Sequence, residues 1–284
     1  MQNPQKTKKL FLMVTLVVFL FLPVFQSSAS VVTPIKILLV PGHDTEVWGA
    51  QYGNIKEADM TLALATQIFN ILKKDKRFEV YITRDATGYT KEFTDYFSNN
   101  QKEIIAFKTD AHKKFKEKIS NGIVVKKVGV LHNAVSKEVS VDLYGINKWA
   151  NENKMDAVIH IHFNDYPRKT KWTIGKYTGF NIYTPDMQLT NSKKSLQLAT
   201  DVLGQLKKKY ATSTYKPEMG GLTFDQNLIA LGSSDTLLSS VRSVLIEYGY
   251  IYEKKFRTKD TRLLAYKNMA NLTVQGIEDY FFKK

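Results

Sequence analysis

One apolar segment, IKILLVPG at residues 35–42, begins an alternation of strands and helices that runs through the chain. Its first six residues are mostly aliphatic and β-branched, and Pro41-Gly42 ends the run, so the segment predicts a short buried strand. Residues 57–74 follow with a helical stripe that includes Leu64, Ile68 and Leu72. A strand followed by an amphipathic helix is the building unit of α/β proteins.

The same alternation continues to the end of the sequence. Further strands are expected at 78–83, 157–162, 179–184 and 243–247, and further helices at 142–153, 192–210 and 261–281, the last of them capped by Asp260. This pattern favours an α/β fold with a mostly parallel sheet. We expect three layers, with a sheet of roughly six strands flanked by helices. Sheets of this kind bind ligands at the carboxyl ends of their strands.

Residues 86–139 interrupt the alternation. They are rich in Lys, Asn and aromatic residues, and residues 94–119 have a helical pattern. We predict a largely helical insertion at the edge of the sheet, inside one domain that spans residues 31–284. The insertion would act as a lid or as a contact surface, although its lysines are equally consistent with an ordinary solvated face.

The first 30 residues have the order of a secretory signal. Lysines within residues 6–9 precede an apolar run at residues 10–22, and small residues at 27–30 offer a cleavage site. The run is shorter than the roughly 20 residues of a comfortable membrane span. An uncleaved N-terminal anchor is the alternative. Either way, we expect an exported protein of the cell wall, periplasm or extracellular space.

Composition restricts the chemistry and the partners. The chain has no cysteine, so disulfides do not hold the fold, and a metal site would have to use His, Asp and Glu. The net charge is +14, which favours polyanionic partners. For an exported protein, these would be anionic cell-wall polymers or a membrane surface. Because no clustered aromatic–basic motif is present, nucleic acid is not an expected partner. We also expect the protein to be a monomer.

Three polar residues occupy positions that suit a metal centre in an α/β enzyme. His43 follows the first strand, Glu57 opens the first helix, and His162 ends the strand at 157–162. Two imidazoles and one carboxylate are a usual ligand set for catalytic zinc, with water in the fourth position. A single histidine after a strand is more often an ordinary hydrogen-bonded loop residue, so the prediction depends on all three together.

A fourth residue strengthens this interpretation. Glu247 closes the last predicted strand, after the apolar run Val244-Leu245-Ile246. A carboxylate at that position must face either solvent or a functional cleft, because burying it unpaired is expensive. The end of a strand neighbouring the metal site could supply a general base.

These segments, in this order, resemble the zinc-dependent N-acetylmuramoyl-L-alanine amidases of the type found in sporulation and cell-division wall hydrolases. The similarity rests on ILLVPGH at 37–43, KEAD at 56–59, TR at 83–84, AN at 150–151, IHFN at 161–164, GF at 179–180, VLIEYGY at 244–250 and the closing helix from Arg262. It covers nearly the whole chain after residue 30, apart from the insertion.

The resemblance implies a mechanism. His43, Glu57 and His162 would hold one Zn²⁺ ion, which acidifies its water and polarises the scissile carbonyl. Glu247 would be the catalytic base, taking the proton of the water and passing it to the leaving amine. The expected substrate is peptidoglycan, cut at the amide between N-acetylmuramic acid and L-alanine of the stem peptide. Asn164 and Asp44 are candidates for orienting a ligand histidine.

The sequence also departs from the family pattern at four positions. Val40 stands where Asp is usual, Asp44 where Gly is usual, His160 where Ser is usual, and Ile146 where Arg is common. No departure removes a proposed ligand or the base. His160 shares a strand face with His162, so a metal contact and simple packing both remain open.

Two other functions stay open on the sequence alone. A related zinc peptidase of the carboxypeptidase kind would share the same metal and base chemistry, since substrate choice depends on loops. A catalytically silent wall-binding protein is the second alternative, suggested by the departures at Val40, Ile146 and His160 and by the basic insertion. Retention of the complete ligand set and of Glu247 favours the enzyme.

Overall fold

The computed structural model describes residues 33–129 and 135–283. The predicted signal or anchor at residues 1–30 therefore lies outside the described part, as does a short piece of the predicted insertion. Within the described ranges, no helix is both long enough and apolar enough to cross a membrane.

The centre of the fold is a six-stranded sheet in the order β4-β1-β7-β10-β8-β9. Its strands are β1 (Ile35–Pro41), β4 (Phe78–Ile82), β7 (Ala157–Asn164), β8 (Asn181–Pro185), β9 (Leu222–Asp225) and β10 (Arg242–Tyr250). The pairs from β4 to β10 are parallel, β10 and β8 are antiparallel, and β8 and β9 are parallel to each other. The prediction of a mostly parallel sheet of about six strands is confirmed.

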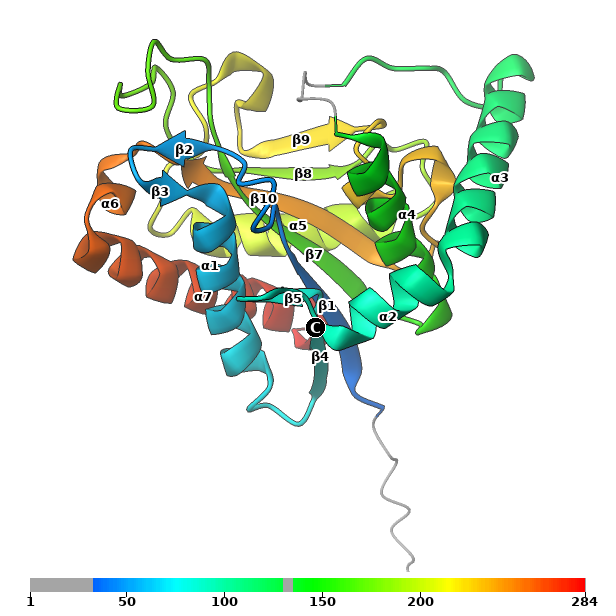
Figure 1. The fold of residues 1–284 in the computed structure, drawn as a ribbon, viewed down its shortest axis with the longest axis horizontal. Coiled ribbons are helices and arrows are strands. Elements are labelled where there is room, and N and C mark those ends of the chain that lie inside the picture. Colours follow the sequence, from blue (N-terminus) through cyan, green and yellow to red (C-terminus); the bar gives the residue numbers. More distant parts are fainter. Residues whose placement is uncertain (1–32, 130–134, 284) are drawn as a thin grey trace, which may run out of the picture. The chain divides into compact units, whose positions relative to one another are not determined.

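Helices cover both faces of this sheet (Figure 1). They are α1 (Glu57–Leu72), α2 (Lys91–Asn99), α3 (Gln101–Ser120), α4 (Lys137–Glu152), α5 (Ser192–Leu206), α6 (Lys254–Arg257) and α7 (Lys259–Phe282), with short 3₁₀ turns η1 (Lys216–Glu218), η2 (Ile229–Leu231) and η3 (Ser233–Asp235). Two small hairpins complete the fold: β2 (Gln51–Tyr52) with β3 (Ile55–Lys56), and β5 (Arg84–Asp85) with β6 (Gly88–Tyr89).

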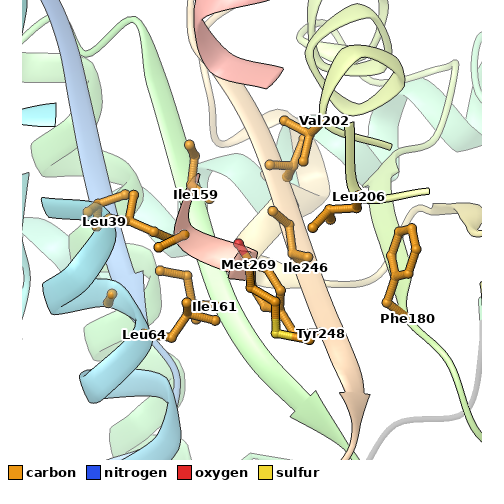
Figure 2. Packing of buried hydrophobic residues seen from close by; sticks show 14 of the residues in the cluster. Leu39, Leu64, Ile159, Ile161, Phe180, Val202, Leu206, Ile246, Tyr248 and Met269 are labelled. Atoms are coloured by element: carbon orange, nitrogen blue, oxygen red, sulfur yellow. The ribbon is translucent and has the colours of Figure 1, made fainter. Parts of the chain in front are cut away.

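The alternation of side chains along each strand divides the core in two. Leu39, Ile161 and Ile246 point to the face that α1, α5 and α7 cover, and Figure 2 shows them packed with Leu64, Val202 and Met269 of these helices. The opposite face carries a smaller cluster in which Leu38, Val40 and Val158 meet Ile146 and Trp149 of α4 and Phe93 of α2. Because successive residues of a strand point to opposite faces, each central strand contributes to both clusters.

The insertion is helical, as predicted, but it is not confined to the edge of the sheet, because Phe93 of α2 packs in the cluster on the face that α4 covers. Helix α3 packs along α4, and Figure 1 shows α2, α3 and α4 grouped on the side of the molecule away from α1. The segment after α3 reaches the loops that follow β8 and β9. There the backbone N–H of Val125 donates to Gln188, that of Lys127 donates to Gln226, and the Lys127 ammonium lies 2.8 Å from the carboxylate of Asp186.

One local prediction was wrong. The last helix begins at Lys259, and Thr258 rather than Asp260 is its N-cap, with its hydroxyl accepting a hydrogen bond from the backbone N–H of Thr261. Asp260 lies inside the first turn of the helix, where a negative charge interacts favourably with the exposed N–H groups.

Candidate active site

The fold brings His43, Glu57 and His162 together at the carboxyl ends of two neighbouring parallel strands. His43 follows β1, His162 lies near the end of β7, and Glu57 is the first residue of α1, reached through the β2–β3 hairpin. One ligand-type atom from each of these three side chains lies within 4.8 Å of the others. The pairing of β1 with β7 explains the meeting, since it aligns the ends of the strands from which both histidines project.

The Glu57 carboxylate lies between the two imidazoles. Its Oε2 is 3.1 Å from Nε2 of His43, and its Oε1 is 3.1 Å from Nδ1 of His162. Two backbone N–H groups hold the carboxylate in place: that of Ala50 donates to Oε2 at 2.8 Å, and that of Phe163 donates to Oε1 at 3.0 Å. The side chain of Glu57 is almost fully buried. Such a fixed carboxylate between two imidazole nitrogens is suited to holding a divalent cation.

Two glycines allow this close approach. A Cβ atom on Gly42 would lie 2.1 Å from the ring of His162, and one on Gly49 would lie 2.5 Å from both Oε2 of Glu57 and the ring of His43. His43 itself has a φ of 62°, a left-handed conformation that is rare for a residue with a side chain. The backbone at this site is therefore shaped around the three ligand side chains.

A buried arginine fixes the loop that carries His43. The Arg84 guanidinium donates to the backbone carbonyls of Pro41, Gly42 and Ala58, and to the hydroxyl of Thr61. These bonds join the end of β1 to the first turn of α1. Arg84 therefore has a structural position, and its partners are carbonyls and a hydroxyl rather than a carboxylate.

The charges of the site are strongly coupled. Burial on its own would raise the pKa of Glu57, but the two adjacent imidazoles outweigh burial and lower it. Burial likewise opposes protonation of His43, yet the facing Glu57 carboxylate raises the pKa of His43 above its usual value. For His162, burial dominates and lowers the pKa. A carboxylate that stays ionised and an imidazole that stays neutral are the forms that bind metal ions.

Glu247 lies beside His162 on the neighbouring strand. The two residues are paired in the register of β10 and β7, so their side chains project from the same face of the sheet. The Oε2 atom of Glu247 is buried and has no hydrogen-bond partner among the described residues. Burial, followed by the nearby carboxylates of Glu57 and Glu218, raises the pKa of Glu247 well above its usual value.

Glu218 is a buried residue of the site that the sequence did not indicate. Its carboxylate accepts four side-chain hydrogen bonds, from Asn164, Tyr183, Ser213 and Tyr250. It follows Pro217 in a 3₁₀ turn and belongs to no apolar or polar pattern, so only the folded structure reveals it. Asn164 is thus directed to Glu218 rather than to a ligand histidine.

The remaining predicted neighbours of the site have other partners. A side-chain oxygen of Asp44 accepts the backbone N–H groups of Glu46 and Val47, which shapes the loop after His43. His160 is fully buried between Val40 and Leu245, and burial lowers its pKa to about 3. It is not part of the metal-binding group found among the described residues.

A mostly parallel α/β sheet with a His–Glu–His group at its carboxyl edge is typical of a metal-dependent hydrolase. The sequence model of the N-acetylmuramoyl-L-alanine amidase family matches residues 37–279. The chain belongs to this family, and it is a hydrolase of the amide between N-acetylmuramic acid and L-alanine. The family's substrate, peptidoglycan, implies that the enzyme acts outside the cytoplasm.

Solved structures of amidases share the fold at low sequence identity. The N-acetylmuramoyl-L-alanine amidase of Clostridium difficile 630 is 18% identical, with a TM-score of 0.54 over 88% of this chain and 98% of that one. The CwlD amidase of Clostridioides difficile, solved in complex with the GerS lipoprotein, is 15% identical with a TM-score of 0.56, covering 87% and 98%. The catalytic domain of the CwlV amidase of Bacillus (Paenibacillus) polymyxa var. colistinus is 15% identical with a TM-score of 0.53, covering 88% and 99%. A search of curated protein sequences gave no significant match.

Proposed function

We propose that this amidase is a zinc enzyme in which His43, Glu57 and His162 bind the ion and Glu247 is the catalytic base. The observation that carries the proposal is the meeting of three ligand atoms within 4.8 Å of one another, with Glu247 in register beside His162. The donor set supports Zn²⁺, because two imidazoles and one carboxylate are its usual catalytic ligands, with one position left for water.

Zn²⁺ bound there would acidify a water molecule and polarise the scissile carbonyl. The chain supplies the rest of the chemistry. Glu57 is held by the N–H groups of Ala50 and Phe163, so it stays in place between the two histidines. The carboxylate of Glu247, in register beside His162, can accept a proton from the attacking water and return it to the amine of L-alanine. Burial raises the pKa of Glu247, which makes its carboxylate a stronger base towards the water.

The proposal extends to the location of the enzyme and to its surface charge. Residues 1–30 would direct export and either be cleaved or tether the enzyme to the membrane. The net charge of +14 would favour association with anionic wall polymers or headgroups close to the peptidoglycan substrate. We further propose that the enzyme acts as a monomer.

Digestion of purified peptidoglycan tests the proposal directly. The protein with Zn²⁺ should release intact stem peptides that begin with a free L-alanine amine, and should leave lactyl groups on peptide-free glycan. A chelator and the Glu247→Gln substitution should each abolish this release. Glu278→Gln, at an exposed ion pair with Arg77, is the matched control and should cut normally. Undiminished cutting by Glu247→Gln would refute the assignment of the base, and release of single amino acids would indicate a peptidase.

A further inference from the structure

A row of polar side chains crosses three neighbouring strands next to the metal-binding group. Glu247 of β10 is paired on one side with His162 of β7 and on the other with Asn181 of β8. Residues directly opposite each other on adjacent strands share a face of the sheet, with their Cβ atoms about 5 Å apart. Asn181 is therefore the direct neighbour of Glu247 on the side away from the metal ligands.

Asn181 is fully buried, and half of its side-chain amide is without a partner. Its Oδ1 accepts a hydrogen bond from the hydroxyl of Thr223 at 3.2 Å. Its Nδ2 has no partner among the described residues, and neither has Oε2 of Glu247. A buried polar group without a hydrogen bond is uncommon and destabilising. Here one unsatisfied donor and one unsatisfied acceptor belong to paired residues.

Glu218, the other carboxylate near Glu247 on this side, already receives several donors. The hydroxyls of Tyr183, Ser213 and Tyr250 and the side-chain amide of Asn164 donate to it. An ionised carboxylate can only accept hydrogen bonds, so it requires a donor from its surroundings. Asn181 offers one without adding a charge to a site that already holds the carboxylates of Glu57 and Glu218.

We propose that a rotation of the two side chains brings the Nδ2 group of Asn181 into a hydrogen bond with the carboxylate of Glu247, a contact that the described structure does not contain, and that Asn181 is thereby a positioning residue for the catalytic base. This proposal rests on the role of Glu247 in the proposed function. The hydrogen bond fixes one carboxylate oxygen against β8 and leaves the other to face His162 and the reacting water. It also stabilises the ionised form of Glu247, which burial and two neighbouring carboxylates disfavour.

The kinetic test compares Asn181→Leu with the wild type in the purified full chain. Leu has the same number and branching of side-chain heavy atoms as Asn, and it removes the donor together with the acceptor of the Thr223 hydroxyl. We expect kcat to fall roughly ten- to hundredfold, the effect of losing one hydrogen bond to a charged group, while KM and zinc content stay within about twofold.

Thr184→Val is the matched control. Thr184 lies on the same strand, is also fully buried, and has a side-chain oxygen that no described residue contacts by a hydrogen bond, but it points to the opposite face of the sheet. The control should keep wild-type kcat. Normal kcat in a folded, zinc-loaded Asn181→Leu protein would overturn the proposal.

A second measurement does not depend on activity. The side-chain amide of Asn181 can be assigned in an NMR spectrum by its absence from Asn181→Leu. One of its two protons should resonate downfield, as expected for a charge-assisted hydrogen bond, and should return to the ordinary range in Glu247→Ala. An amide signal that Glu247→Ala does not move would refute the contact. Full activity of Glu247→Gln would instead refute the proposed function, so the two failures are distinguishable.

Discussion

Gly42→Ala should separate zinc binding from folding. The added Cβ would lie 2.1 Å from Cε1 of His162 and 2.4 Å from its Nε2. Non-bonded heavy atoms prefer about 3.5 Å, so the ring has to move by about 1.4 Å. Metal ligands and catalytic groups must be held within about 0.5 Å of their working positions. The substitution therefore moves a proposed ligand by nearly three times the tolerance of a metal site.

We expect zinc affinity to fall at least about 10–100-fold, the range found when supporting residues of metal ligands are lost. The free energy of unfolding without zinc should fall by about 1–3 kcal/mol, the usual effect of overpacking. Zinc affinity is measured by competition with a chromogenic chelator, and stability by denaturant unfolding of the metal-free protein.

Gly204→Ala is the control for Gly42→Ala. Gly204 lies in α5 and has no atom within 4 Å of an added Cβ, so zinc affinity should not change, and the helix should gain up to about 1 kcal/mol. Wild-type zinc affinity in a folded Gly42→Ala protein would refute the reasoning, because His162 would then either tolerate the displacement or not bind the ion.

Three further predictions concern the supports of the site. Arg84→Met should lower the free energy of unfolding by about 2–5 kcal/mol in denaturant titrations, because it removes the buried guanidinium that donates to the carbonyls of Pro41, Gly42 and Ala58. The Thr61 hydroxyl still donates to the last two, and a loss below about 1 kcal/mol would contradict the prediction. Glu218→Gln should destabilise by about 1–3 kcal/mol, since an amide cannot accept four hydrogen bonds, whereas exposed Glu278→Gln should change stability by less than about 1 kcal/mol; equal effects would argue against the Glu218 network. Burial and the nearby Asp44 raise the pKa of Asp142 from 3.8 to about 6. The folded state therefore holds the proton of Asp142 more tightly than the unfolded state, and the free energy of unfolding falls as the pH rises between these two pKa values. Asp142→Asn should therefore be more stable than the wild type at pH 7 but not at pH 4, and a pH-independent difference in melting temperature would exclude this cause.

The sequence was sufficient for the elements that form continuous apolar runs. Strands β1, β7 and β10 are buried on both faces, and such strands are visible as apolar segments without any knowledge of their neighbours. Strand β9 was missed because its pattern is reversed: Thr223 and Asp225 face inward, while Phe224 is 42% exposed. Hydrophobic periodicity cannot find a strand whose buried residues are polar.

The site residues that follow apolar strands could be predicted from the sequence for a related reason. His43, His162 and Glu247 stand at the ends of apolar strands, so their positions in the sequence already place them at one edge of the sheet. Glu218 and Asn181 have partners that are distant in the sequence, and nothing in their local surroundings distinguishes them from ordinary polar residues. Their roles depend on hydrogen bonds that exist only after folding.

The departures from the family pattern also become intelligible in the structure. Val40 and Ile146 belong to the same buried apolar cluster, on the face of the sheet that α4 covers. Replacing a buried pair of opposite charges by apolar residues is often neutral or stabilising, whereas losing only one charge leaves the other unpaired. His160, paired with Val40 across the strands and kept neutral by burial, adds no charge to this layer. The three departures are therefore mutually consistent. Each places an uncharged side chain on the face of the sheet that α4 covers, and none alters His43, Glu57, His162 or Glu247.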